Sequence, residues 1–370
     1  MHPETLSDPR STKGRRVAGI LERDPTASLL GGLILVAILC FGLVAPARFF
    51  SSGTLRAMAF EMPELGILAL AMMVALLSGG LNLAIIATSN LSGLVIAGVI
   101  VGLIRPESSV QEIAAEIALA FAAGLVTSLV VGLVTGSVVA FLGVHPILVT
   151  LSTMIALKGL AVLITGGRAI GGFPPAILFL GDGALLGIPV SLLLFAVCAI
   201  LVAKILSDSP FGIAVRMIGS NEKATRFSGV ATDRVLVGVY VLSSVLCWVA
   251  SIVMMARFNS ARSGYAESYL LITILAAVLG GVNPFGGFGR IYGLVLSLIL
   301  LQVISTGFTI LGFSPHLKEG IWGATMILAT LLLALRGKLA QTLNRKAFLI
   351  LRARRGGFFQ SNPHERRTKL

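Results

Sequence analysis

A polar segment at residues 207–234 separates two apolar runs long enough to cross a membrane, and it holds side chains suited to binding. It contains Gly-Ser-Asn-Glu-Lys-Ala at residues 219–224 and closes with Ser-Gly-Val at residues 228–230. Carboxylate, ammonium and amide groups can make ion pairs and hydrogen bonds with a soluble partner protein. The alternative, a polar loop that only connects two membrane helices, remains open.

Neutral polar side chains inside the apolar runs form a second group that could bind a ligand. In lipid each of them is costly unless it faces a partner, a cavity or a pathway. Amides and hydroxyls suit ligands that are rich in hydroxyl groups, and hydrogen bonds between helices are the alternative. The candidates for a substrate path are Asn82, Ser89, Asn90, Asn283 and Gln302.

The positions of the charged residues argue against a carrier that is driven by its own proton or ion relay. Such a relay needs acidic or histidine side chains in the middle of the membrane. Most acidic residues of this chain, among them Glu61 and Glu64, are predicted at the edges of the apolar runs, and Glu116 is the one that can reach deeper. Lys158 lies within a run and is expected to find a partner or to extend towards the membrane surface. An external source of energy is therefore expected.

No catalytic or metal-binding residues are predicted, and no cofactor is expected on this chain. Cys40, Cys198 and Cys247 lie in apolar runs without CxxC spacing, where thiols behave as small hydrophobic side chains. A nucleotide-binding loop needs a glycine-rich turn that ends in Gly-Lys followed by Ser or Thr. The Gly-Lys pair at residues 337–338 is followed by Leu339, so the chain is not expected to hydrolyse ATP or to be an enzyme.

Membrane helices must hold these groups in place. The chain is 56% hydrophobic and 12% charged, against roughly a quarter charged in soluble domains. Its apolar runs last about 20 residues and do not alternate, which favours helices over barrel strands. We predict an all-α, polytopic membrane protein of about ten transmembrane helices, or nine or eleven, with broken or re-entrant segments at residues 78–82 and before Asn283. The predicted helices cover residues 29–45, 64–83, 84–104, 113–142, 145–165, 184–206, 235–256, 270–282, 291–313 and 317–335.

The basic residues predict how the chain crosses the membrane. The formal net charge is +13, and Lys and Arg gather in the N-terminal tail, the polar segment and the C-terminal tail. Because cytoplasmic loops carry the excess of basic residues, both termini are expected in the cytoplasm. The C-terminal tail is expected to contact membrane lipid, and no nucleic-acid partner is predicted. The predicted divisions are residues 1–28 (N-terminal tail), 29–335 (transmembrane domain) and 336–370 (C-terminal tail).

Four stretches, in the same order along the chain, resemble the permease family of bacterial sugar importers that includes the ribose permease. They lie at residues 78–83, 146–167, 211–230 and 276–290, and the resemblance spans roughly residues 64–335. In one place the chain departs from the family, which commonly has Gly-Gly-Ile-Asp-Leu-Ser. This sequence has Asn82 in place of the acid and Ala84 in place of the hydroxyl.

The resemblance implies a transmembrane permease subunit of an ATP-driven ABC importer, in the inner membrane of a bacterium, that translocates a monosaccharide or related polyol. The implied partners are a cytoplasmic ATPase with two cassettes, which binds the ATP, a periplasmic sugar-binding protein, and a second permease copy that is identical or a sister chain. Two alternatives remain. One is the same mechanism with branched-chain amino acids or nucleosides as cargo, and the other is a stand-alone secondary carrier or channel.

The resemblance also implies that the polar segment is the coupling loop through which the ATPase acts. Glu222, Lys223 and Arg226 are then expected to make charged contacts with the ATPase, and Phe227 an apolar one. Glycines are expected where the loop turns. The implied coupling residues are Gly219, Asn221, Glu222, Lys223, Ala224, Arg226, Phe227 and Gly229.

Overall fold

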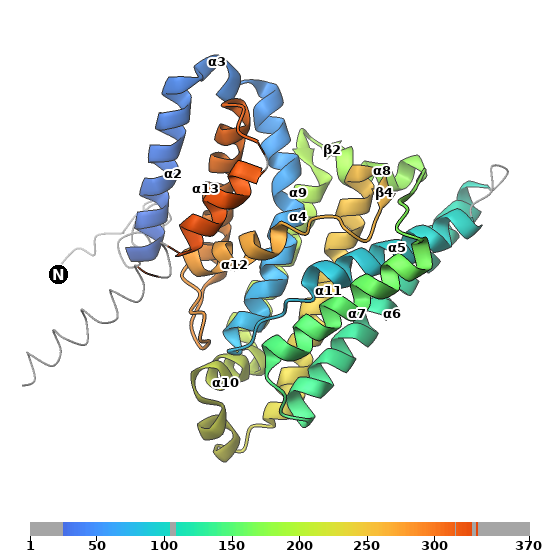
Figure 1. Cartoon of the computed structure of the whole chain (residues 1–370), viewed down its shortest axis with the longest axis vertical. Coiled ribbons are helices and arrows are strands. Elements are labelled where there is room, and N and C mark those ends of the chain that lie inside the picture. Colours follow the sequence, from blue (N-terminus) through green and yellow to red (C-terminus); the bar gives the residue numbers. More distant parts are fainter. Residues whose placement is uncertain (1–24, 104–108, 315, 328–330, 332–370) are drawn as a thin grey trace, which may run out of the picture. The chain divides into compact units, whose positions relative to one another are not determined.

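The computed structural model describes residues 25–103, 109–314, 316–327 and 331 of the chain. These residues divide into two compact units, one ending at Glu319 and one beginning at Gly320. Most of the predicted N-terminal tail, the whole C-terminal tail and much of the predicted helix at 317–335 lie outside the described residues. All of the helices and strands below belong to the first unit (Figure 1).

Eight helices of the described chain are long and apolar enough to cross a membrane, which confirms the predicted all-α, polytopic class. The eighth predicted segment, residues 270–282, forms an apolar helix of only 11 residues, α12 (Tyr269–Leu279), whereas a full crossing needs about 20. The eight are α2 (Pro25–Val44), α4 (Ser52–Leu77), α5 (Ile85–Leu103), α6 (Val110–Phe141), α7 (Pro146–Thr165), α9 (Val190–Asp208), α11 (Thr232–Phe258) and α13 (Ile291–Ile310).

Shorter elements lie between these helices. The helix predicted to begin at residue 184 begins at Val190, because residues 184–189 form a hairpin whose turn has positive φ at Leu186 and Gly187. The polar segment is mostly helical. The short elements are α3 (Pro46–Phe49), α8 (Pro175–Asp182) and α10 (Pro210–Phe227), with β1 (Ile170–Gly171) antiparallel to β4 (Ser260–Ala261) and β2 (Ala184–Leu185) antiparallel to β3 (Ile188–Pro189).

Helix α11 packs against α6, α4 and α5, and the second half of α4, from Pro63 to Leu77, is buried throughout. Glycines allow α6 to approach α11 closely, since a Cβ atom on Gly136 would lie 2.9 Å from the Cα atom of Val237. Along α2, by contrast, only 11% of the membrane-length window is buried within the chain. The apolar surface of α2 is thus available for lipid or another protein.

Two breaks interrupt the membrane helices where the sequence predicted them. The first break, residues 78–84, lies between α4 and α5, and the second break, residues 280–290, lies between α12 and α13. Gly79 and Gly281 each have a φ of about +84°, a conformation that only glycine adopts without strain. Irregular backbone at membrane depth is tolerated where it packs on protein. Both breaks pack in this way, against α10.

Candidate functional site

Helix α10 consists of two helical pieces that meet at Asn221. The backbone there has φ −161° and ψ 100°, which is extended. The Asn221 Oδ1 atom accepts a hydrogen bond from the backbone N–H of Ala224 at 3.0 Å, as an N-cap residue does. The piece before Asn221 is partly buried, and the piece after it, residues 222–227, is mostly exposed. We call the two parts the inner piece (residues 210–220) and the outer piece (residues 222–227).

The outer piece ends in an exposed aromatic ring with charged side chains beside it. Phe227 is 92% exposed. Arg226 forms ion pairs with Glu222 at 3.7 Å and with Asp233, and its Nε atom donates to the Thr232 Oγ1 atom at 3.0 Å. Ion pairs this exposed contribute little stability, about 0–1 kcal/mol each. Through Thr232 and Asp233, Arg226 links the outer piece to the start of α11.

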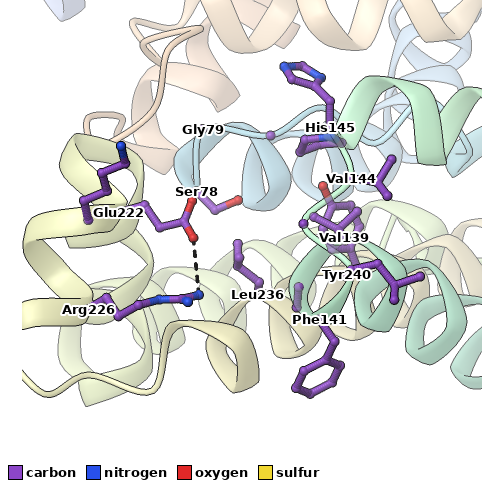
Figure 2. A pocket seen from close by; sticks show the side chains of 16 residues that line it. Ser78, Gly79, Val139, Phe141, Val144, His145, Glu222, Arg226, Leu236 and Tyr240 are labelled. Carbon is purple, nitrogen blue, oxygen red and sulfur yellow. Dashed lines mark ion pairs between the residues drawn. The ribbon is translucent and has the colours of Figure 1, made fainter.

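A cavity of about 700 Å³ lies beside the outer piece. Figure 2 shows Glu222 and Arg226 on one side of it, Ser78 of the first break next to them, and Phe141, Val144 and His145 across from them. One wall thus carries charges and the other is largely apolar. The further lining residues are Gly79, Gly80, Val139, Ala140, Leu142, Gly143, Pro146, Lys223, Leu236 and Tyr240.

The two predicted turn glycines occupy different positions. Gly229 follows α10 in a turn with a φ of +83°, and a Cβ atom there would meet nothing within 4 Å. Gly219 lies within the inner piece rather than at a turn. A Cβ atom on Gly219 would lie 2.0 Å from the backbone oxygen of Leu77. Glycine is therefore needed at residue 219 because another backbone segment lies too close for a side chain. At residue 229 it is needed because the backbone has a positive φ.

Four of the five candidate path residues make local or interhelical hydrogen bonds. Asn82 donates from Nδ2 to the Ser243 Oγ atom at 2.9 Å and accepts from the backbone N–H of Ala84 at 3.1 Å. Its polar atoms therefore fix the first break to α11, which is the alternative that the sequence left open. The others are Ser89, which donates to the Met254 Sδ atom at 3.7 Å; Asn283, which accepts from the backbone N–H of Phe285 at 3.1 Å; and Gln302, which donates to the Glu61 Oε2 atom at 3.0 Å.

Asn90 borders a second cavity, of about 180 Å³. Its Nδ2 atom donates to the backbone oxygens of Ser263 and Tyr265 at 3.0 and 2.9 Å. Lys158 also lines this cavity and ion-pairs with Glu267 at 2.7 Å, both side chains being about half exposed. The sequence predicted that Lys158 would find a partner, and in the structure this partner is Glu267. Glu267 was not among the candidate site residues.

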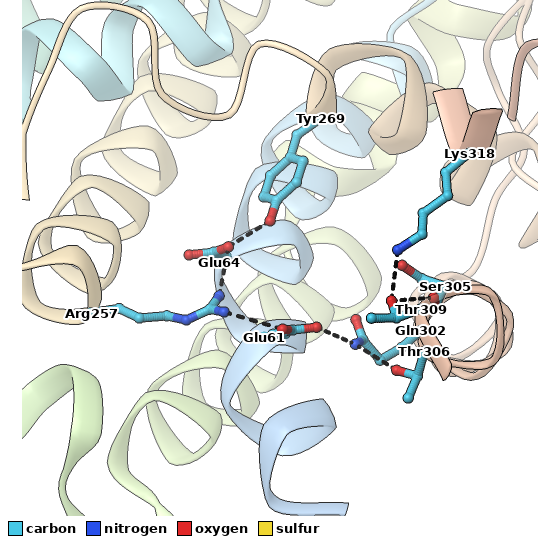
Figure 3. A network of polar contacts seen from close by, with 9 residues as sticks. All are labelled: Glu61, Glu64, Arg257, Tyr269, Gln302, Ser305, Thr306, Thr309 and Lys318. Atoms are coloured by element: carbon cyan, nitrogen blue, oxygen red, sulfur yellow. Dashed lines mark hydrogen bonds and ion pairs between the residues drawn. The ribbon is translucent and has the colours of Figure 1, made fainter. Parts of the chain in front are cut away.

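A polar network inside the helix bundle was missed by sequence reasoning (Figure 3). Its centre is Glu64, whose side chain is 0% exposed and whose Oε1 atom lies 2.8 Å from Arg257 Nη1. Tyr269 donates to the same oxygen at 2.6 Å. Arg257 also lies 3.5 Å from Glu61, which in turn accepts from Gln302. The network joins α4, α11, α12 and α13.

The prediction that Glu64 lies at the edge of a membrane helix is wrong. Helix α4 begins at Ser52, twelve residues earlier than the predicted start, and Ser51 caps it by accepting from the backbone N–H of Thr54 at 3.2 Å. Proline is usual at the start of a helix, but Pro63 lies inside α4. The serine cap before residue 52 was the signal that could have located the true start.

The described residues thus form an exposed outer piece of α10, the two cavities described above and a buried polar network, and they include no cluster of side chains that could hold a metal ion. No solved structure matches the chain. Three relatives are each named "Autoinducer 2 import system permease protein LsrD". Those of Photorhabdus temperata and Photorhabdus laumondii subsp. laumondii are 30% and 28% identical over 306 residues, which is 81% of this chain and 88% of each relative. That of Salmonella typhi is 30% identical over 304 residues, or 80% of this chain and 88% of the relative.

The family described as "Branched-chain amino acid transport system / permease component" matches residues 55–330. This region contains α10, both breaks and most of the membrane-length helices. The match confirms the permease resemblance that the four sequence stretches predicted. Since it covers well over half of the chain, the protein belongs to this family of permease components and is a multi-pass membrane protein.

Proposed function

We propose that the chain is the transmembrane subunit of an ATP-driven importer in a bacterial inner membrane, and that its ATPase docks on the outer piece of α10. The observation that carries this proposal is the outer piece itself. It presents the exposed ring of Phe227 beside the charges of Glu222 and Lys223, within a chain of the permease family. Aromatic side chains surrounded by polar groups are typical of protein interfaces.

The order of the helices supports a cytoplasmic position for α10. Six membrane-length helices precede it among the described residues: α2, α4, α5, α6, α7 and α9. After an even number of crossings the chain returns to the side on which it started. With the N-terminus in the cytoplasm, as the basic residues predict, α10 lies where an ATPase can reach it.

The proposed partners are an ATPase with two cassettes, which binds the ATP, a periplasmic sugar-binding protein, and a second permease, identical or sister. The names of the relatives, which are parts of import systems, support an assembly of several components. We expect that the tagged chain, purified from native membranes in mild detergent, brings down an ATPase with two cassettes, identified by mass spectrometry. Recovery of the chain alone, with transport in liposomes without ATP, would instead identify a carrier or channel.

We propose as cargo a small, neutral molecule rich in hydroxyl groups, either a monosaccharide or related polyol or autoinducer 2, the molecule in the relatives' names. The cavity beside Asn90 supports this class. The Lys158–Glu267 pair borders this cavity, with 2.7 Å between Nζ and Oε1, and carries no net charge. An ammonium has three donors and a carboxylate two acceptor oxygens, so the pair does not use all of them. Hydroxyl groups can therefore donate to the carboxylate or accept from the ammonium without separating the pair.

Lys158→Met is expected to lower uptake about fivefold, because Glu267 loses its partner at the cavity and an exposed pair contributes up to about 1 kcal/mol. The measurement is uptake of labelled ribose, autoinducer 2 and leucine by cells that carry the complete system. Lys204→Met is the matched control, since Lys204 is exposed on α9 and lines neither cavity described above. Unchanged uptake in Lys158→Met, or uptake of leucine but of neither other compound, would contradict the proposed cargo site.

A further inference from the structure

Three backbone segments meet at Gly219 without a side chain between them. A Cβ atom on Gly219 would lie 2.0 Å from the backbone oxygen of Leu77, at the end of α4, and 2.4 Å from the backbone nitrogen of Gly287, in the second break. Non-bonded atoms do not approach a Cβ atom this closely, so the contact requires glycine at residue 219. We call this contact the 219 junction.

The two breaks are also joined to each other at this point. The backbone N–H of Gly287 donates to the backbone oxygen of Leu77 at 3.0 Å. A Cβ atom on Gly286 would lie 2.7 Å from both the oxygen of Gly219 and the Cα atom of Gly79. The inner piece of α10 is thus in backbone contact with both of the irregular membrane segments, and those segments are hydrogen-bonded to each other.

A side-chain contact strengthens the same arrangement. The Arg216 Nη1 atom, from the inner piece, donates to the backbone oxygen of Gly289 in the second break at 2.9 Å. The first break continues to Asn82, which is hydrogen-bonded to Ser243 of α11. The inner piece therefore contacts the end of α4 and the segment just before α13 directly. It is connected to α11 through the first break and Asn82.

The kink at Asn221 separates this junction from the exposed surface of α10. The contact residue Gly219 lies two positions before the kink, and exposed Glu222 and Lys223 follow directly after it. The inner piece thus contacts the membrane segments, while the outer piece is open to a partner. Figure 1 shows α10 next to the end of α4 that is farther from α3.

We propose that the 219 junction is the mechanical link through which movement of the outer piece reaches both breaks, with Gly219 as a positioning residue. This inference rests on the proposed docking of an ATPase at α10. Backbone packed on backbone has no rotamers that could absorb a displacement, so the inner piece and the two breaks move as one body. The glycines that join α6 to α11 differ, because they connect two membrane helices and do not contact α10.

The first test is Gly219→Ala in the complete transporter. The outer piece keeps its whole sequence in this variant, so binding of the ATPase is measured beside uptake. Uptake, and the stimulation of ATP hydrolysis by the loaded binding protein, are expected to fall at least tenfold, because the added methyl group separates α10 from Leu77. Gly98→Ala is the matched control, since a Cβ atom on this helical glycine would meet nothing within 4 Å.

The second test inserts two glycines between Ser220 and Asn221. Both residues are exposed, and both the junction and the outer piece keep their sequences, so folding and ATPase binding are expected to persist while uptake falls at least tenfold. The same insertion between Leu186 and Gly187, in the β2–β3 turn, is the control.

The insertion decides the outcome even if Gly219→Ala fails to fold. Loss of uptake with the ATPase still bound supports the rigid link. Uptake at the wild-type level in the insertion variant overturns the link and leaves the proposed function standing. If the wild-type chain itself binds no ATPase, the proposed function fails, and the inference fails with it.

Discussion

Arg257→Leu is expected to destabilise the protein by about 3–5 kcal/mol. The Arg257 guanidinium lies 2.8 Å from the carboxylate of Glu64, which has no exposed surface. Removing the cation leaves a buried charge whose remaining hydrogen bond comes from Tyr269. Within a membrane helix bundle such a charge finds little water to replace its partner. The measurement is the temperature at which the detergent-solubilised protein loses its monodisperse peak, and this temperature should fall clearly.

Two further variants show whether the buried charge is the cause. Glu64→Gln combined with Arg257→Leu removes both charges and should recover much of the lost stability, because a neutral amide costs less to bury than an unpaired carboxylate. Arg48→Leu is the control, since Arg48 is exposed at the end of α3 and forms no ion pair with the described residues. Equal loss in the single and double variants would show that packing, rather than charge, stabilises this region.

The apolar runs predicted most of the membrane helices because most runs are about as long as the membrane is thick. The breaks could also be predicted, since glycines and Asn82 or Asn283 interrupt the runs. Boundaries that depend on local chemistry were less predictable. The sequence predicts a helix from residue 184, where the β2–β3 hairpin lies, because apolar residues such as Ala184 and Leu185 fit a strand as well as a helix.

The candidate site was only partly predictable, because its polar contacts join residues far apart in the chain. The outer piece of α10 is a local feature, and its exposed Phe227 lies within a recognisable motif. The Glu64–Arg257 pair, in contrast, links residues 193 positions apart. Asn82 and Ser243 are separated by 161 positions, so the sequence could not show that the Asn82 side chain is hydrogen-bonded to Ser243 of α11.

The contacts of Arg226 change how the coupling loop should be tested. Sequence alone suggested that Arg226 is as free to contact a partner as Glu222. In the structure Arg226 binds Thr232 and Asp233, so its removal would also loosen the connection between α10 and α11. Loss of transport in an Arg226 variant would therefore not separate docking from folding. Phe227 provides the cleaner test, because its ring is 92% exposed.

Phe227→Asp is expected to weaken ATPase binding at least thirtyfold, since loss of an aromatic hot spot costs about 2 kcal/mol or more. The ring is so exposed that the isolated chain should keep its fold, and a titration of the detergent-solubilised permease with purified ATPase measures the affinity. Leu186→Asp is the matched control, because Leu186 is also fully exposed but lies in the β2–β3 turn, at the other end of α9 from α10. An unchanged affinity in Phe227→Asp would remove the outer piece from the docking surface. An equal loss in both variants would mean that added negative charge, rather than the missing ring, weakens the complex.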